Sequence, residues 1–147
     1  MENTSLFKII FTHKAYPLIR LTLSRGSVLS EIKESFITFH YTEKIKSDLI
    51  ITASLLEALT DMTDEEIVGA EKLLVAYFNA LIKEVNIATN ASKVQGFQEV
   101  STKLEEAIQQ TRQHNYTNAE RLVSEAVSIT TTNGSRAIQV LKERSLI

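Results

Sequence analysis

The stretch DEEIVGAEKLLVAYFNALIKEVNIAT, residues 64–89, carries the clearest structural signal in the chain. Its apolar residues recur every three or four positions, the period of one helix face: Ile67, Ala70, Leu74, Phe78, Leu81, Val85 and Ala88. Three acids at 64–66 suit the first turn, and Thr60, Asp61 or Thr63 precedes them as a cap. We therefore predict a helix over 64–89, about 40 Å long at a rise of about 1.5 Å per residue.

The apolar arc of this helix is wider than one core-facing stripe requires. Val68, Val75 and Ile82 widen it beyond the main stripe. Such an arc indicates either a helix at the centre of a bundle or a second contact to another chain, because exposed apolar patches mark interfaces. Val68, Val75 and Ile82 are therefore the candidate interface, with a second copy of the chain or another protein as the partner.

Helical periodicity continues on both sides of this segment. Residues 43–60 place apolar side chains on one stripe, as do residues 93–114 after an expected loop, NIATNAS, at 86–92. The two stripes comprise Ile45, Leu49, Thr52, Leu56 and Leu59 in the first and Val94, Phe97, Leu104, Ala107 and Ile108 in the second. Both segments are predicted to be amphipathic helices.

The next stretch, HNYTNAERLVSEAV at 114–127, combines a polar turn with a new helical stripe. Its Asn-Tyr-x-x-Ala step resembles the corner between the two helices of a tetratricopeptide-type repeat. A solenoid needs the pattern again at a spacing of about 34 residues in at least three copies, and the chain does not repeat it. We therefore predict one corner of a self-contained bundle.

The run TTTNGS, residues 130–135, is predicted to end that helix. Consecutive β-branched threonines disfavour helix, and Asn-Gly favours a turn. A last amphipathic helix is then expected over 135–145, with Ala137, Ile138 and Leu141 facing the core.

The N-terminal third has two interpretations. IRLTLSR at 19–25 alternates as a strand does, and FITFHYT at 36–42 is rich in β-formers. Helical features also occur there: a possible face at Phe7, Ile10 and Phe11, a helix start at Pro17, and a stop at Gly26 followed by a cap at Ser27. We expect three short to medium helices, with a β-hairpin or small sheet as the alternative.

Composition limits the remaining choices. One proline and four glycines are too few for the turns of a β-sandwich or barrel, and 44% hydrophobic with 23% charged residues is typical of a globular domain. The absence of cysteine excludes disulfides, thiol nucleophiles and cysteine-ligated metals. A net charge of -2 gives no attraction to nucleic acid or anionic lipid. Without a long apolar run or a basic, signal-like N-terminus, the chain is expected to be soluble and cytoplasmic.

Candidate chemistry is sparse. His13, His40 and His114 are far apart, and neither Glu-x-x-His nor His-x-x-x-His spacing occurs, so no metal or cofactor is expected. His40, Tyr41, Tyr77 and His114 are the polar groups from which a ligand or metal site between helices would be built. Arg25 and Ser27, beside Gly26, form the one candidate anion site, provided that a helix begins at Ser27.

Together these features predict an all-α, single-domain, up-and-down bundle of about five to six helices over residues 1–147. The favoured function is a non-catalytic structural or protein-interaction bundle that forms homo-oligomers. The alternative is a small-molecule or metal-binding bundle, including an enzyme, with its site between helices.

Overall fold

A computed structural model describes the backbone from residue 16 to residue 147 and the side chains from residue 25 onward. This part of the chain forms four α-helices and contains no strand. Their bounds are α2 Tyr16–Thr60, α3 Asp64–Ser92, α4 Gln95–Arg112 and α5 Tyr116–Glu143. The chain divides into two compact units, Met1–Glu34 and Ser35–Ile147, each described by itself. Phe7, Ile10, Phe11 and His13 lie outside the described residues, and the expectation of a single domain remains a prediction.

The first unit is described from Tyr16, where α2 begins. The helix passes through Gly26 and Ser27, so the predicted stop and cap are wrong. An isolated glycine costs a helix only about 1 kcal/mol relative to alanine, which flanking helix formers compensate. The hairpin alternative is also wrong, since residues 19–25 and 36–42 are both helical in α2.

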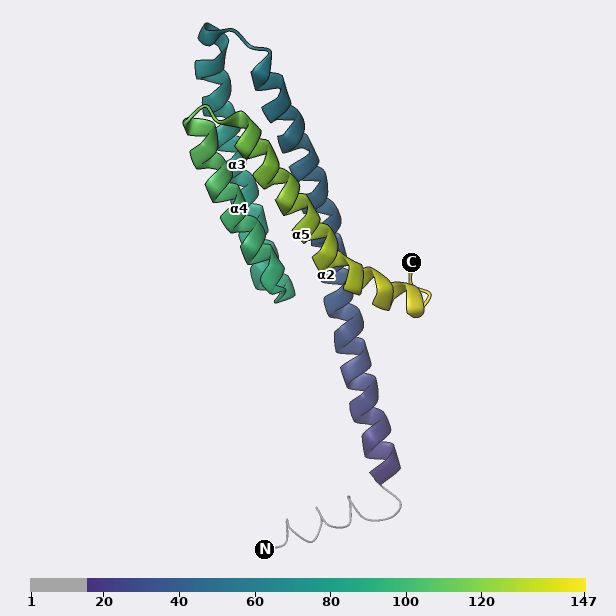
Figure 1. The fold of residues 1–147 in the computed structure, drawn as a ribbon. Coiled ribbons are helices and arrows are strands. Elements are labelled where there is room, and N and C mark those ends of the chain that lie inside the picture. Colours follow the sequence, from purple (N-terminus) through teal and green to yellow (C-terminus); the bar gives the residue numbers. More distant parts are fainter. Residues whose placement is uncertain (1–15) are drawn as a thin grey trace, which may run out of the picture. The chain divides into compact units, whose positions relative to one another are not determined.

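The second unit is an up-and-down bundle of α3, α4, α5 and the part of α2 from Ser35. α4 packs against α5 and against α3, and Figure 1 shows α4 and α5 side by side. One apolar cluster joins all four helices, and its fully buried members include Leu49, Leu56, Phe78, Val85, Phe97, Leu104 and Val123. The all-α prediction is thus confirmed, with four helices in the described part instead of five to six. None of the described helices is long and apolar enough to cross a membrane.

The buried stripe of α2 explains why its N-terminal half was misread. Buried residues follow one another at alternating spacings of three and four: Ser35, Thr38, Thr42, Ile45, Leu49, Thr52, Leu56 and Leu59. The first three are polar, so a hydrophobic pattern is absent where the helical packing is present. The helix predicted at 43–60 is therefore the apolar half of a longer element.

The two helix ends around α3 follow local chemistry. The Thr63 backbone N–H donates to the Glu66 carboxylate at 2.9 Å, which confirms the predicted start near residue 63. At the other end, α3 extends through the expected loop at 86–92. Ala88 and Ser92 are buried there, and the Ser92 hydroxyl donates to the Ala88 carbonyl at 2.6 Å.

The predicted break at 130–135 is also wrong, because α5 is one helix through Glu143. Thr130 is buried, and its hydroxyl donates to the Ala126 carbonyl at 2.8 Å; Thr131 makes the equivalent bond to Val127 at 2.9 Å. These side-chain bonds follow the helix instead of competing with it. Packing thereby overrides the low helix propensity of the run.

Side chains packed directly against glycines hold this part of α5 in the bundle. A Cβ on Gly134 would lie 2.3 Å from Thr42 Cγ2 of α2. A Cβ on Gly96 of α4 would lie 1.8 Å from Asn133 Nδ2 of α5. Both glycines are therefore contact sites between helices, and the Asn-Gly pair that signals a turn is here a packing device.

Candidate functional site

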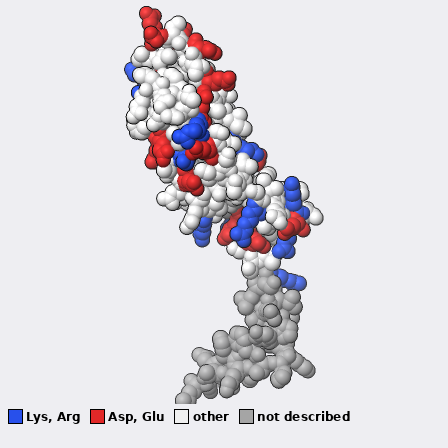
Figure 2. Space-filling model, in the orientation of Figure 1, with Lys and Arg blue, Asp and Glu red and all other residues white. Residues whose placement is uncertain are grey.

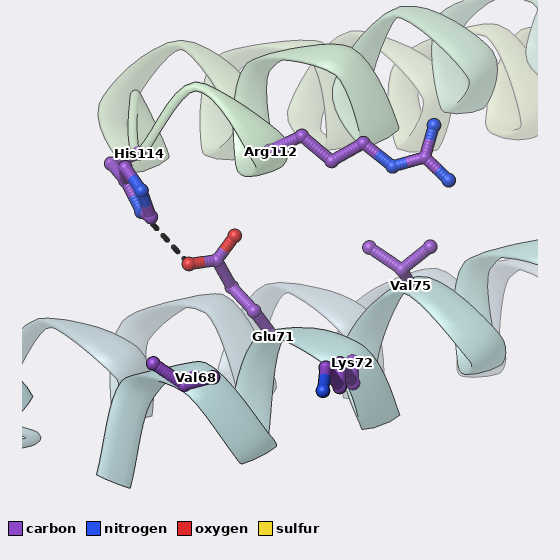
Figure 3. Close-up of a pocket in the computed structure, with 6 residues that line it drawn as sticks. All are labelled: Val68, Glu71, Lys72, Val75, Arg112 and His114. Carbon is purple, nitrogen blue, oxygen red and sulfur yellow. Dashed lines mark ion pairs between the residues drawn. The ribbon is translucent and has the colours of Figure 1, made fainter. Parts of the chain in front are cut away.

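A cleft of ≈ 380 Å³ lies between α3 and the corner that joins α4 to α5. Figure 3 shows α3 along one side and the end of α4 with the following turn along the other. Six residues line the cleft: Val68, Glu71, Lys72, Val75, Arg112 and His114. Two of these, Val68 and Val75, belong to the predicted interface, and His114 belongs to the predicted ligand set.

The α3 side of the cleft supplies an apolar floor interrupted by one acid. Val68 is 59% exposed, and Val75 is half-buried and packs on the core. Glu71 lies between them, and only 12% of its side chain is exposed. At helical spacing Glu71 stands between Ile67 and Leu74 on the core stripe, so its carboxylate is held against the bundle.

The opposite side is shaped by the end of α4. The His114 N–H donates to the Thr111 carbonyl at 3.0 Å, and the Asn115 N–H donates to the Gln110 carbonyl at 2.8 Å. With His114 in the left-handed region at φ 59°, these bonds form a Schellman motif. Three residues, 113–115, separate α4 from α5, and this short turn directs His114 and Tyr116 toward α3 and confirms the predicted corner.

The Glu71 carboxylate accepts from both residues of this corner. His114 Nδ1 lies 2.8 Å from Glu71 Oε2, and the Tyr116 hydroxyl donates to the same oxygen at 2.9 Å. Burial, then the hydrogen bond to Glu71 and its charge, raise the pKa of Tyr116 to about 12. Since the raised pKa belongs to the folded state, this group stabilises the fold below pH 10, and the contribution is lost as pH rises through about 12.

Two cations of the cleft lack a protein counter-charge. Arg112 in the last turn of α4 and Lys72 on α3 are exposed, and among the described residues neither forms an ion pair or a side-chain hydrogen bond. In Figure 3 the Arg112 guanidinium extends over Val75. The cleft thus combines an apolar floor, two available cations and an acid whose Oε2 is occupied by internal donors.

The other predicted ligand residues lie elsewhere. The Tyr77 hydroxyl lies 3.5 Å from the Asp48 carbonyl of α2, and burial raises the pKa of Tyr77. His40 and Tyr41 form an edge-to-face pair on α2, with ring centroids 5.5 Å apart. The structure does not bring these groups to His114. Within residues 16–147, no three histidine, aspartate or glutamate side chains are placed to hold a metal ion.

The remaining predicted residues are also dispersed. Ile82 is half-buried against the core and does not line the cleft. Arg25 and Ser27 are exposed on a continuous stretch of α2, so the helix start on which the anion hypothesis depends is absent there.

A second feature of α3 is an exposed apolar stripe, here called the outer face: Leu73, Ala76, Ala80 and Ile87. Leu73 is 76% exposed and Ile87 is 53% exposed. By helical periodicity, Lys83 lies on this face between Ala80 and Ile87, and Glu84 borders it on one side. Glu84 also holds Lys44 of α2 at 2.7 Å.

The surface charge elsewhere is mixed. Figure 2 shows acidic side chains gathered at the end of the bundle where α2 meets α3, and basic and acidic side chains interspersed below it. An ion-paired group joins α4 to α5, where Lys103 Nζ lies 2.9 Å from Glu125 Oε2 and Arg121 pairs with the same carboxylate. The hydrogen bond from Lys103 lowers the pKa of Glu125.

Sequence reasoning missed four residues of this site: Glu71, Lys72, Arg112 and Tyr116. Glu71 carried a usable signal, because an acid on a core stripe requires buried partners. Arg112 and Tyr116 carried none, since their positions depend on the chain reversal between α4 and α5. Comparison of the chain with protein-family models, with curated proteins and with solved structures finds no match.

Proposed function

We propose that this chain is a non-catalytic interaction protein that forms homodimers through the outer face of α3. The observation that carries the proposal is the exposure of Leu73, 76% of whose surface is open to solvent. Leucine and isoleucine side chains left exposed on one helix face lose contact with water when a second helix covers them.

The pattern of small and large residues on this face suits a helix partner. Leu73, Ala76, Ala80 and Ile87 follow one another at spacings of three, four and seven, which is the period of a two-helix seam, and Lys83 occupies the intervening position between Ala80 and Ile87. Alanine at the two central positions permits close backbone approach, and the larger side chains at either end supply apolar area.

The charges beside the face favour a second copy in parallel orientation. In a parallel pair about a two-fold axis, a seam side chain packs among four residues of the facing helix, and for Lys83 these include the partner's Glu84. Two equivalent ion pairs result, one on each side of the seam. Because the face is a single helix stripe, its area is at the small end of stable interfaces, and we expect a concentration-dependent dimer.

The interface predicted from sequence is shifted by this proposal. Val75 and Ile82 pack on the core, and Val68 borders the cleft. The exposed apolar residues of α3 that support self-association are Leu73 and Ile87, on a different face from the predicted interface.

Sedimentation velocity over a concentration series tests the proposal. The wild type is expected to sediment as a dimer at high concentration, and Leu73→Gln is expected to remain monomeric. Ile50→Gln is the matched control, because Ile50 is 54% exposed on α2 and lines a different groove. A monomeric wild type, or equal dimerisation of Leu73→Gln and Ile50→Gln, would sink the proposal.

Cysteine cross-linking tests the orientation, and the chain has no native cysteine to interfere. In a parallel pair Ala76→Cys meets its own copy and forms a disulfide-linked dimer under mild oxidation. Ser54→Cys on α2 is the exposed control and should remain a monomer. Efficient cross-linking of Ser54→Cys with none at Ala76→Cys would contradict the proposed seam.

A further inference from the structure

We infer that the cleft between α3 and the α4–α5 corner binds a small organic carboxylate, meaning a carboxylate group on a short, unbranched apolar chain. The inference is independent of dimerisation, because the cleft residues Val68, Val75 and Arg112 lie outside the outer face of α3. It rests on three properties of the cleft: its floor, its charge and its size.

The floor accounts for the apolar part of the ligand. Val68 and Val75 are two helical turns apart on α3, about 10 Å at a rise of about 1.5 Å per residue. Val68 is the more exposed of the two, and both line the ≈ 380 Å³ cleft. An unbranched alkyl chain laid along α3 covers both valines, and the volume is at the lower end of that found for small-molecule sites.

The charges account for the carboxylate. Arg112 lies over Val75 at one end of the floor and has no ion pair among the described residues. Its guanidinium presents paired N–H donors, which match the two oxygens of a carboxylate. Lys72 adds a second positive charge at the cleft.

The internal acid of the cleft does not cancel this preference. Glu71 Oε2 already accepts from Tyr116 and lies 2.8 Å from His114 Nδ1. The carbonyl groups at the end of α4 are also occupied, because the His114 and Asn115 N–H groups donate to those of Thr111 and Gln110. A single negative charge on the ligand is favoured over a double one, since Glu71 still repels a dianion such as phosphate.

A methyl NMR titration separates the two parts of the ligand. With Val68 and Val75 methyl signals as the readout, octanoate supplies both parts, octanol lacks the charge and acetate lacks the chain. Octanoate is expected to bind about fivefold to tenfold more tightly than octanol, the effect of one partly exposed charge-assisted contact. It is expected to bind more than about tenfold more tightly than acetate, which lacks the methylene groups that cover the two valines. Octanol or acetate binding as tightly as octanoate would overturn the inference.

Substitution of Arg112 tests whether this residue binds the carboxylate of the ligand. Arg112→Gln is expected to weaken octanoate binding about fivefold to tenfold while leaving octanol binding unchanged. Arg136→Gln on α5 is the matched control, because Arg136 is exposed and outside the cleft, and it should leave octanoate binding unchanged. Both residues are exposed, so neither change should disturb the fold. Equal octanoate affinity in Arg112→Gln and the wild type would refute the site.

Discussion

Substitution of Gly134 by alanine tests how tightly α5 packs against α2. In an open helix position this change stabilises by about 1 kcal/mol, because alanine is the better helix former. At Gly134 the new Cβ would lie 2.3 Å from Thr42 Cγ2, 2.9 Å from Thr42 Oγ1 and 3.0 Å from Thr42 Cβ. Rotation of the Thr42 side chain relieves the first contact but not the last, so the two helices must separate.

The steric cost decides whether Gly134→Ala raises or lowers the free energy of unfolding. Overpacking of a close-packed core costs about 1 to 3 kcal/mol, and three contacts to one buried residue belong at the upper end. Subtracting the gain in helix propensity, we expect Gly134→Ala to lower the free energy of unfolding by about 2 kcal/mol. Gly69→Ala on α3 is the control, since a Cβ there meets nothing within 4 Å; it should raise stability by up to about 1 kcal/mol.

Urea denaturation of four proteins measures the coupling: wild type, Gly134→Ala, Thr42→Ala and the double variant. Thr42→Ala removes Cγ2 and Oγ1 but keeps Cβ. The gain in helix propensity should then offset the remaining Cβ contact, so Gly134→Ala should be close to neutral in that background and the coupling should be about 2 kcal/mol. If Gly134→Ala stabilises the wild type as Gly69→Ala does, the close packing of α5 on α2 is wrong, and with it the explanation for the helical TTTNGS run.

Three further predictions concern single side chains. Between pH 10 and 12 the free energy of unfolding should fall more steeply for the wild type than for Tyr116→Phe, because the raised pKa of Tyr116 belongs to the folded state; parallel profiles would contradict the burial of the Tyr116 hydroxyl beside Glu71. As pH falls below 4.5, the free energy of unfolding should decrease more in the wild type than in Lys103→Gln. Lys103 lowers the pKa of Glu125, and the stability that this provides is lost when Glu125 is protonated; identical pH profiles would argue against the pair. Thr131→Ala should raise the melting temperature through a gain of about 0.5 kcal/mol, as expected for an exposed site inside a helix, whereas a turn at 130–135 would give no gain.

The helices that pack through large apolar side chains could be predicted from the sequence, because those side chains give a clear helical period. Residues 64–89 and 93–114 bury Phe78, Leu81, Phe97 and Leu104, and the helices were placed close to their observed bounds. The corner at 114–115 was readable because polar residues interrupt two clear stripes.

The errors share a physical cause, which is packing by small polar residues. Thr38 and Thr42 occupy buried positions of α2, and Thr130 and Gly134 occupy buried positions of α5. These residues have low helix propensity and little hydrophobicity, so local rules predict strands or turns where close helix contact decides the structure. The cleft was only half predictable for a related reason: Val68, Val75 and His114 were identified, but their assembly with Arg112 depends on the geometry of the α4–α5 corner.

The two proposed surfaces are adjacent faces of α3, and this arrangement decides which variants can separate them. Lys72 directly precedes Leu73 and also lines the cleft, so its substitution would change the electrostatic field at both surfaces. Leu73 belongs only to the outer face, and Arg112 only to the cleft. Dimerisation lost in Leu73→Gln with octanoate binding intact, and the reverse in Arg112→Gln, would therefore establish two independent sites. Loss of both properties in either variant would mean that the cleft and the dimer seam are one site.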